Sequence, residues 1–168
     1  MRCVVPIDKI PVKLQVNGVD TASTIEPRLL LSDYLRYEAG LTGVHVGCEH
    51  GVCGACTVLI DGHPVRSCLT FAVQVQHAQI TTIEGIALQG EMHAIQKAFQ
   101  KNHGLQCGFC TPGMVLTIVD LLRRDPNPTE QSIREGISGN LCRCTGYEGI
   151  VAAALEAASD LRQARTQA

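Results

Sequence analysis

The first half of the chain alternates between apolar and polar side chains with the period of a β-strand. Residues 12–16 alternate in this way, and Asn17-Gly18 follows before a second extended segment at 19–25. Asn-Gly between two such segments is typical of a two-residue hairpin turn, because both of its residues must adopt positive φ. The pattern therefore predicts a β-hairpin over residues 12–25.

The rest of this half predicts one helix and a second hairpin. Apolar residues spaced for one helical face indicate a helix over 29–38, which Gly40 ends. Asp61-Gly62 is a further two-residue turn signal. Strands are expected on both sides of this turn and at the end of the segment, at residues 57–60, 63–67 and 79–83.

From about residue 86 the strand pattern gives way to helical periodicity. We expect Thr111 to cap one helix with Pro112 at its first position, Asn127 to cap another, and Thr145 with Glu148 to form a capping box. The helices predicted from these signals and from the apolar spacing cover residues 91–102, 111–122, 127–138 and 145–158.

This change of pattern predicts an α+β chain of two domains. Residues 1–83 are expected to form a small α+β domain, and residues 84–168 an all-α four-helix bundle. With 45% hydrophobic and 18% charged residues, the composition is that of an ordinary globular protein that can bury a core of moderate size.

Charge and hydropathy argue against nucleic-acid and membrane roles. The net charge is -2 and the sequence has no basic run, so neither nucleic acid nor an anionic membrane surface is an expected partner. Residues 1–8 lack the apolar core of a signal peptide, and the most apolar stretch, 114–122, is interrupted by Thr117 and Asp120. We expect no membrane span and a cytoplasmic location.

Cysteine is the residue type that points to chemistry. The chain has nine cysteines, and in a reducing compartment clustered thiols are more plausibly metal ligands than disulfides. Cys3 stands alone near the N-terminus and is expected to be an incidental thiol. The other eight form two candidate ligand quartets: Cys48, Cys53, Cys56 and Cys68, then Cys107, Cys110, Cys142 and Cys144.

The first quartet has the spacing of a plant-type [2Fe–2S] site. Its pattern is C-x4-C-x2-C followed by a distant fourth cysteine, set among glycines that let the backbone wrap closely around a cluster. Extending the predicted hairpin pairs Cys56 with Ser67 and Ala55 with Cys68, which brings Cys68 close to Cys56. Four thiolates also suit zinc, but the spacing favours iron–sulfur. His50 is interpreted as a loop residue.

The second quartet is ambiguous by spacing alone. A C-x2-C pair and a C-x-C pair occupy two links between predicted helices, and either a [2Fe–2S] cluster or zinc fits them equally well. We expect Cys107 to pair with Cys110, and Cys142 with Cys144. The predicted helices that follow each pair directly should aim their positive N-terminal ends at the site.

Four motifs in this order carry a resemblance to a known family. They read GCEHGVCGACTV at 47–58, RSCL at 66–69, QCGFCTPGM at 106–114 and GNLCRCTGY at 139–147. The chain resembles the small iron–sulfur subunit of the molybdenum hydroxylases, the xanthine oxidase family, from about residue 12 to residue 158. The resemblance implies a plant-ferredoxin-like β-grasp domain, a four-helix bundle and a [2Fe–2S] cluster in each.

The resemblance also implies partners and a direction of electron flow. A large subunit would carry a molybdopterin cofactor and a medium subunit would carry FAD, in a heterotrimer or a dimer of heterotrimers. Electrons would pass from molybdenum to the helical cluster, then to the ferredoxin-like cluster, then to FAD. By the same resemblance Cys144 and Gln106 lie against the pterin; the alternative for Gln106 is an ordinary polar loop residue.

No catalytic residue is expected in this chain, because thiolates and sulfides fill every metal position and leave no substrate site. Substrate choice would belong to the large subunit. A second hypothesis is a freestanding redox or sensing module with one ferredoxin-like cluster and a zinc-stabilised helical domain.

Overall fold

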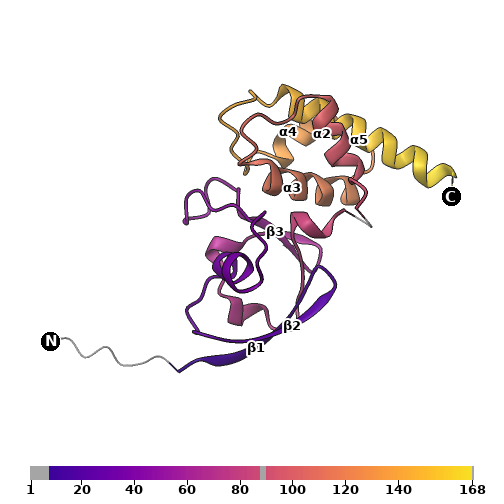
Figure 1. Ribbon diagram of the computed structural model, residues 1–168. Helices are drawn as coiled ribbons and strands as arrows, with labels where there is room; N and C mark the ends of the chain where they lie inside the picture. The colour runs from indigo at the N-terminus through magenta and orange to yellow at the C-terminus, as the bar shows by residue number, and fades with distance from the viewer. Residues whose placement is uncertain (1–7, 88–89, 168) are drawn as a thin grey trace.

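The computed structural model describes residues 8–87 and 90–167, and Cys3 lies outside this part of the chain. Its two units are stacked, with the sheet-containing N-terminal unit below and the helical unit above (Figure 1). The α+β class and the order of the two units are as predicted. In the described residues no helix is both long and apolar enough to cross a membrane.

The N-terminal unit is built on a mixed sheet of five strands in the order β2-β1-β5-β3-β4. The outer pairs are antiparallel hairpins, and β5 lies parallel to β1 and antiparallel to β3 in the middle. The hairpin strands coincide closely with the predicted segments, whereas β5 is shorter than expected. The strands are β1 (Ile10–Val16), β2 (Val19–Ile25), β3 (Thr57–Ile60), β4 (His63–Arg66) and β5 (Gln79–Thr81).

Both predicted hairpin turns are present. Asn17 and Gly18 have φ values of 51° and 79°, and Asp61 and Gly62 have 49° and 81°. Two successive residues with positive φ are what a two-residue type I′ turn requires, and its twist matches that of the flanking strands. These turns set the register that later positions Cys56 and Cys68.

The helix over the sheet differs from its prediction in detail. It begins with α1 (Leu31–Asp33) and continues as the wider π-helical turn η1 (Tyr34–Glu38), in which the Ala39 N–H donates to the Tyr34 carbonyl at 3.0 Å. Tyr34 is buried, and its hydroxyl lies 3.1 Å from Thr21 Oγ1. Gly40 ends the helix at a φ of 72°, as predicted.

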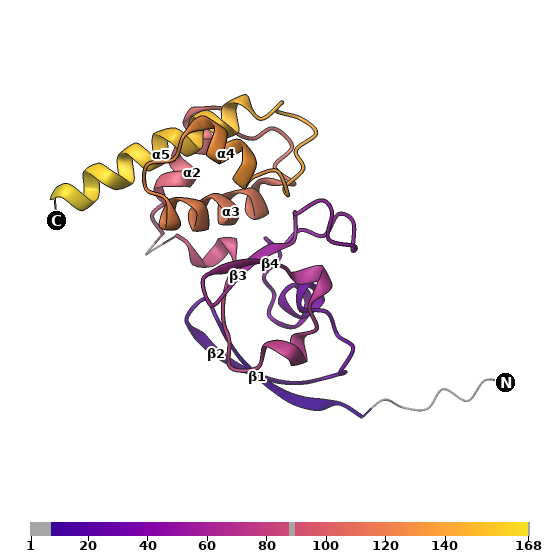
Figure 2. The same ribbon diagram turned by 180° about the vertical axis from the view of Figure 1, so that it is seen from behind.

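The sheet unit contains three short 3-10 segments, η2 (Ser67–Leu69), η3 (Ala72–Val75) and η4 (Ile83–Gly85). The first and the last of them begin where the end of a strand was predicted. The strand expected over 63–67 therefore stops at Arg66, and the one over 79–83 stops at Thr81. These helical turns close the sheet unit and lead the chain upward to the helical unit (Figure 2).

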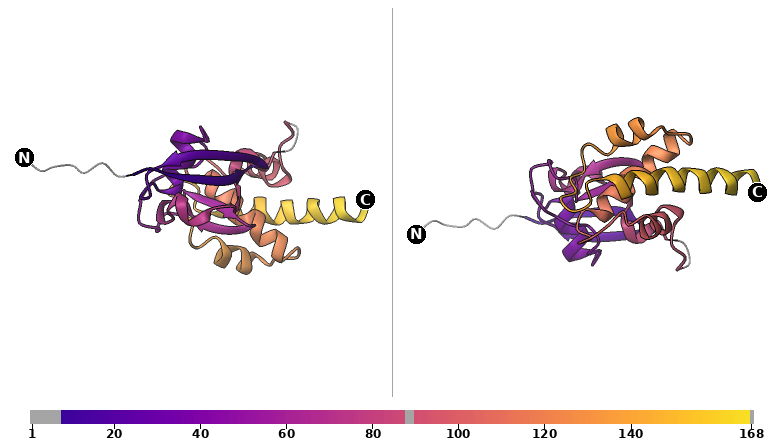
Figure 3. Two further views of the ribbon diagram at one scale, coloured as in Figure 1. Left: turned by 90° about the horizontal axis from the view of Figure 1, so that it is seen from below. Right: turned by 90° about the horizontal axis from the view of Figure 1, so that it is seen from above.

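The described part of the helical unit contains four α-helices, as predicted. They are α2 (Ala94–Lys101), α3 (Thr111–Arg124), α4 (Glu130–Gly136) and α5 (Glu148–Gln167). Figure 3 shows that the far end of α5 projects beyond the other helices. The core between them is apolar and fully buried, and includes Ile95, Phe99, Met114, Ile118, Ile133 and Ile150.

Two predicted caps are wrong by position. Cys110, not Thr111, is the N-cap of α3, so Pro112 takes the second helical position. Thr129, not Asn127, caps α4 by accepting the Ser132 N–H at 3.1 Å.

The predicted capping box of the last helix does not form either. Thr145 Oγ1 accepts the Tyr147 N–H, and the Glu148 carboxylate pairs with Arg134 at 2.9 Å. The helix therefore begins at Glu148. Thr145 lies before the helix, in the loop that carries Cys142 and Cys144.

The two units pack directly against each other. Leu59 on β3 belongs to the helical unit's core. Gly113 in α3 lies so close to the first cysteine loop that a Cβ there would fall on the carbonyl oxygens of Gly54 and Ala55. Helix α3 therefore lies flat on the segment that carries Cys53 and Cys56.

Candidate iron–sulfur centres

The loop that leads into β3 carries three cysteines of the first quartet. Cys48 and Cys53 are half-buried, whereas Cys56 and Cys68 are buried. The Cys53 N–H donates to Cys48 Sγ at 3.4 Å. The thiols influence each other's pKa most strongly within two pairs, Cys48 with Cys53 and Cys56 with Cys68.

The β3–β4 hairpin brings Cys68 to this loop. Ile60 pairs with His63 as predicted, and Cys56 O accepts both the Ser67 N–H at 3.3 Å and the Ser67 hydroxyl at 2.7 Å. The ladder ends there because Ser67 starts a 3-10 turn, so the expected pairing of Ala55 with Cys68 does not extend the sheet. The turn nevertheless places the Cys68 thiol against that of Cys56.

The electrostatics of the first quartet differ between its two ends. Hydrogen bonds from the backbone N–H groups of Cys53 and His50 lower the pKa of Cys48 to about 6. Burial, followed by the hydrogen bond with Cys56, raises the pKa of Cys68 to about 11. The thiolate is thus favoured at the accessible end of the quartet and disfavoured inside.

The second quartet is assembled from two interhelical loops. Cys107 and Cys110 lie between α2 and α3, and Cys142 and Cys144 between α4 and α5. The expected pairing within each loop is wrong, because Cys107 Sγ lies 3.5 Å from Cys144 Sγ and the Cys110 thiol is hydrogen-bonded to that of Cys142. Each loop contributes one outer and one inner thiol, since Cys110 is held at the start of α3 while Cys107 lies at the surface.

The pKa values of the second quartet separate the inner pair. Burial, followed by the hydrogen bond with Cys142, raises the pKa of Cys110 to about 12. Burial also acts to raise the pKa of Cys142, but hydrogen bonds from Thr145 and the Cys144 backbone outweigh it and lower the value. The second quartet therefore contains a partly buried sulfur, Cys142, whose surroundings favour the thiolate.

The two expected helix ends follow their cysteines at different spacings. Cys110 is itself the N-cap of α3, so the partial positive charge of that helix end can act on a bound group. Helix α5 begins at Glu148, four positions after Cys144 and not directly after it as expected, and its first turn carries the negative charge of Glu148. The expected action of the α5 end on the site stays a prediction.

Hydrogen bonds connect the loops of the two quartets. The Leu141 N–H donates to Cys53 O at 2.9 Å, and the side chain of Asn140 donates to Gly54 O at 3.0 Å. Arg66 reaches across from β4 to the Gly139 carbonyl at 2.6 Å. These contacts join Cys53, Gly54 and Arg66 of the first unit to residues 139–141, which directly precede Cys142.

A second bridge runs through an aromatic pair. His45 Nδ1 lies 2.8 Å from the Phe109 carbonyl oxygen, and the two rings stack with centroids 4.9 Å apart. Through this contact Phe109, which lies between Cys107 and Cys110 of the second quartet, reaches the first unit.

The sequence reasoning missed Asn140, Arg66 and Leu141 as connecting residues. A buried polar side chain must be hydrogen-bonded, and that of Asn140 contacts the Gly54 carbonyl and the hydroxyls of Thr57 and Thr117. No sequence signal could have found it, because its burial is visible only in the fold. Asn140 is 1% exposed. Its amide oxygen accepts the Thr117 hydroxyl at 3.1 Å.

No three His, Cys, Asp or Glu side chains in residues 8–87 and 90–167 gather tightly enough to share a single metal ion. The Cys107 and Cys144 sulfurs lie 3.5 Å apart, and the other thiols influence each other's pKa most strongly in pairs, two pairs to each quartet. A single tetrahedral zinc would need all four sulfurs around one point. A cluster with two irons needs two sulfurs at each end.

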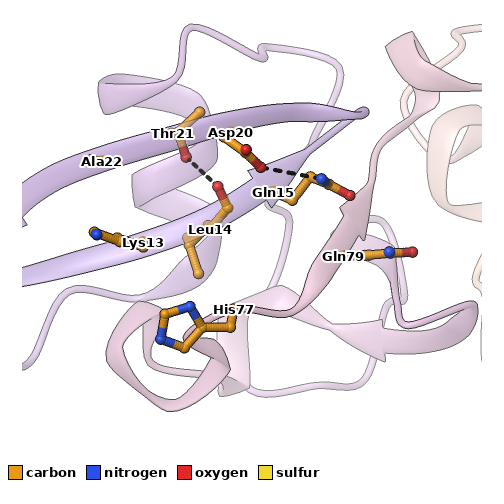
Figure 4. A pocket seen from close by; sticks show the side chains of 8 residues that line it. All are labelled: Lys13, Leu14, Gln15, Asp20, Thr21, Ala22, His77 and Gln79. Carbon is orange, nitrogen blue, oxygen red and sulfur yellow. Dashed lines mark hydrogen bonds between the residues drawn. The ribbon is translucent and has the colours of Figure 1, made fainter.

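Gln106 and His50 neighbour the quartets, whereas the hollow on the sheet lies apart from them. Gln106 is exposed beside Cys107, and the His50 ring contacts the Cys48 carbonyl. A polar hollow of about 430 Å³ on the sheet, between β1, β2 and His77, contains no cysteine (Figure 4). In it Gln15 donates to Asp20 at 3.1 Å.

Comparison with known proteins matches both units. Residues 14–81 match the 2Fe-2S iron-sulfur cluster binding domain family, and residues 82–155 the [2Fe-2S] binding domain family. The second match contradicts the hypothesis of a zinc-stabilised helical unit, because it places that unit in an iron–sulfur domain family.

Several relatives are subunits of dehydrogenases. The chain is 52% identical over 145 residues to the 6-hydroxypseudooxynicotine dehydrogenase complex subunit beta of Paenarthrobacter nicotinovorans, covering 86% of this chain and 91% of the relative. It is 52% identical over 143 residues to the caffeine dehydrogenase subunit gamma of Pseudomonas sp. (strain CBB1), covering 83% and 86%.

The fold has solved counterparts as well. A chain of quinoline 2-oxidoreductase from Pseudomonas putida 86 superimposes with a TM-score of 0.90 at 46% identity, covering 93% of this chain and 98% of that one. Together the two domain matches, the full-length relatives and this structural likeness show that the chain belongs to the family of small iron–sulfur subunits of molybdenum hydroxylase-type dehydrogenases.

Proposed function

We propose that this chain relays electrons through two [2Fe–2S] clusters, one in each unit, from a molybdopterin cofactor on a large partner subunit to FAD on a medium one. The first cluster would be held by Cys48, Cys53, Cys56 and Cys68, and the second by Cys107, Cys110, Cys142 and Cys144. The observation that carries the proposal is the pairing of thiols within each quartet. The division at residues 83 and 84 into two cluster domains is part of the same proposal.

The donor set fits this cofactor. Two thiol pairs per quartet supply two sulfurs for each iron, and a bound [2Fe–2S] cluster would provide one-electron redox chemistry. The hydroxyl of Thr111, beside Cys110, is buried and has no hydrogen-bond partner in the described part of the chain. Such a donor suits a sulfide of a bound cluster, since buried hydroxyls are normally hydrogen-bonded.

Exposure supports the direction of transfer. Cys107 and Cys144 are exposed and Gln106 lies beside them, so electrons would enter at this surface, where Gln106 and Cys144 would contact the pterin. The hydrogen bond from Leu141 to Cys53 offers a short link inward. The first quartet would pass electrons to FAD near Cys48, which is more accessible than Cys56 and Cys68.

The partners would complete the enzyme. We propose a cytoplasmic heterotrimer or dimer of heterotrimers, since clustered thiols stay reduced in the cytosol. Several relatives are named for nicotine or its derivatives, caffeine and quinoline, and others are aldehyde oxidoreductases at lower identity. We therefore propose that the large subunit hydroxylates a nitrogen heteroaromatic compound, while this chain contributes no substrate contact.

Electron paramagnetic resonance of the reduced native complex tests the relay. We expect two distinguishable [2Fe–2S] signals, of which Cys110→Ser removes one and Cys68→Ser the other. Cys3→Ser, which lies outside both quartets, is the matched control and should retain both. A single signal together with stoichiometric zinc in the purified chain would contradict the proposal.

Purification of the native protein tests the partners. A tag on this chain should retrieve a large chain containing molybdenum and a medium chain containing flavin, and native mass should distinguish one heterotrimer from two. A lone monomer with both clusters intact would instead support a freestanding carrier.

A further inference from the structure

A threonine hydroxyl contacts one of the candidate ligand sulfurs. Thr145 Oγ1 lies 3.1 Å from Cys142 Sγ, and the same oxygen accepts the Tyr147 N–H at 3.1 Å. A thiolate bound to iron has no hydrogen and can only accept. With Cys142 as a ligand, Thr145 must therefore donate its one hydroxyl hydrogen to the sulfur.

The turn around this contact is held on both sides. The Tyr147 hydroxyl accepts the Cys142 N–H at 2.9 Å and donates to the Asn140 carbonyl at 3.2 Å. Cys142, Thr145 and Tyr147 are all partly buried. The position of the Thr145 hydroxyl is therefore set by the loop and does not depend on a mobile surface rotamer.

The first quartet has no equivalent among the described residues. Its two nearby buried hydroxyls donate to backbone carbonyls, Ser67 to Cys56 O at 2.7 Å and Thr57 to Gly54 O at 2.6 Å. In residues 8–87 and 90–167 a hydroxyl-to-sulfur hydrogen bond occurs only at Cys142. The feature therefore distinguishes the helical centre from the other one.

We propose that Thr145 is a positioning residue that raises the reduction potential of the helical [2Fe–2S] centre. This rests on the proposed function. Reduction adds one electron while all four thiolates stay bound, so negative charge on the ligand sulfurs increases. A hydrogen bond to sulfur is stronger in that state and stabilises it, which raises the potential. The helical centre thereby becomes a better acceptor for electrons that leave the catalytic partner.

Redox titration of the complete complex, followed by electron paramagnetic resonance, tests the proposal. Thr145→Val keeps the shape of the side chain and removes the hydroxyl, and Thr145→Ser keeps the hydroxyl. We expect Thr145→Val to lower the midpoint potential of the signal that Cys110→Ser removes and to leave the other signal in place. Thr145→Ser should keep both potentials near those of the wild type.

Three outcomes overturn the proposal: no shift in Thr145→Val, an equal shift of both signals, or the same shift in Thr145→Ser. A general structural role of Thr145 would not move one potential alone. If the wild-type complex lacks two iron–sulfur signals, the proposed function fails first. If it has both and only the shift is missing, the relay stands and the role of Thr145 does not.

A second measurement needs no variant of Thr145. Resonance Raman spectra of the wild-type complex in H2O and D2O report exchangeable hydrogen bonds to ligand sulfur. We expect a deuterium shift in the iron–sulfur stretching bands that disappear in Cys110→Ser. If the frequencies of the helical centre's bands are the same in H2O and D2O, the proposal is overturned. This outcome can be read even if Thr145→Val cannot be loaded with iron.

Discussion

The Leu141 N–H donates to the Cys53 carbonyl at 2.9 Å. Leu141 directly precedes Cys142, so this one hydrogen bond joins the backbone of a ligand candidate in the first quartet to the backbone beside one in the second. Residues so far apart in the chain meet because Gly113 lets α3 lie against the first cysteine loop. The relative position of the two centres therefore depends on the joint between the units.

Asn140 should be a main support of that joint. Asn140→Ala removes the donor to Gly54 O and the acceptor of the Thr117 hydroxyl. Gly54 O still accepts from Thr57, and the Thr117 hydroxyl still has the Gly113 carbonyl. The cost is therefore that of the lost hydrogen bonds, about 0.5–1.5 kcal/mol each, and the midpoint of thermal unfolding should fall. Asn127→Ala is the matched control, because Asn127 is exposed. Equal midpoints for the two variants would contradict this role.

Gly113→Ala should separate α3 from the first cysteine loop. The new methyl group would meet the backbone oxygens of Gly54 and Ala55, which cannot move aside as a side chain can. Overpacking of this kind costs about 1–3 kcal/mol. Chemical denaturation should show the loss.

Gly136→Ala provides the comparison for this variant. Its methyl group would meet only the tip of the Leu121 side chain, which can rotate, and alanine gains about 1 kcal/mol of helix propensity over glycine. We expect Gly136→Ala to be near neutral. An equal free energy of unfolding for Gly113→Ala and the wild type would contradict the close packing of α3 on the first cysteine loop.

Arg66 should act through geometry as well as charge. Its guanidinium donates to Thr57 Oγ1 and to the Gly139 carbonyl at once. A lysine ammonium is a point charge that does not reproduce this fork, so Arg66→Lys should lose about 0.5–1.5 kcal/mol. Hydrogen exchange of residues 139–141 should accelerate in the variant. Unchanged protection there would show that Arg66 does not hold the joint.

Tyr147→Phe should loosen the helical centre. The hydroxyl bridges the Cys142 N–H and the Asn140 carbonyl, and its removal leaves both groups unpaired at about 1–3 kcal/mol each. We expect a strong chelator to bleach the helical centre faster than in the wild type.

The control for this variant is Tyr37→Phe, since Tyr37 is 74% exposed. Its bleaching rate should equal that of the wild type. Faster bleaching of both centres in Tyr147→Phe would point to general unfolding instead of a local effect on Cys142.

Local patterns were enough for much of the fold. The turns at Asn17-Gly18 and Asp61-Gly62 were predictable because few residues adopt two successive positive φ angles. The helices were predictable from apolar periodicity, whereas their starts were not. Thr129 and Cys110 take the cap positions instead of Asn127 and Thr111, because a cap depends on where the chain enters the helix.

By itself the sequence determined the two quartets, the two units and their order, because spacing, turn chemistry and periodicity are local properties. Only the tertiary structure decided which thiols pair: Cys107 with Cys144 and Cys110 with Cys142. It also decided that Leu141, Asn140 and Arg66 join the two centres. Such contacts arise when helices and sheet pack together, and their partners lie too far apart in the chain for any local pattern to pair them.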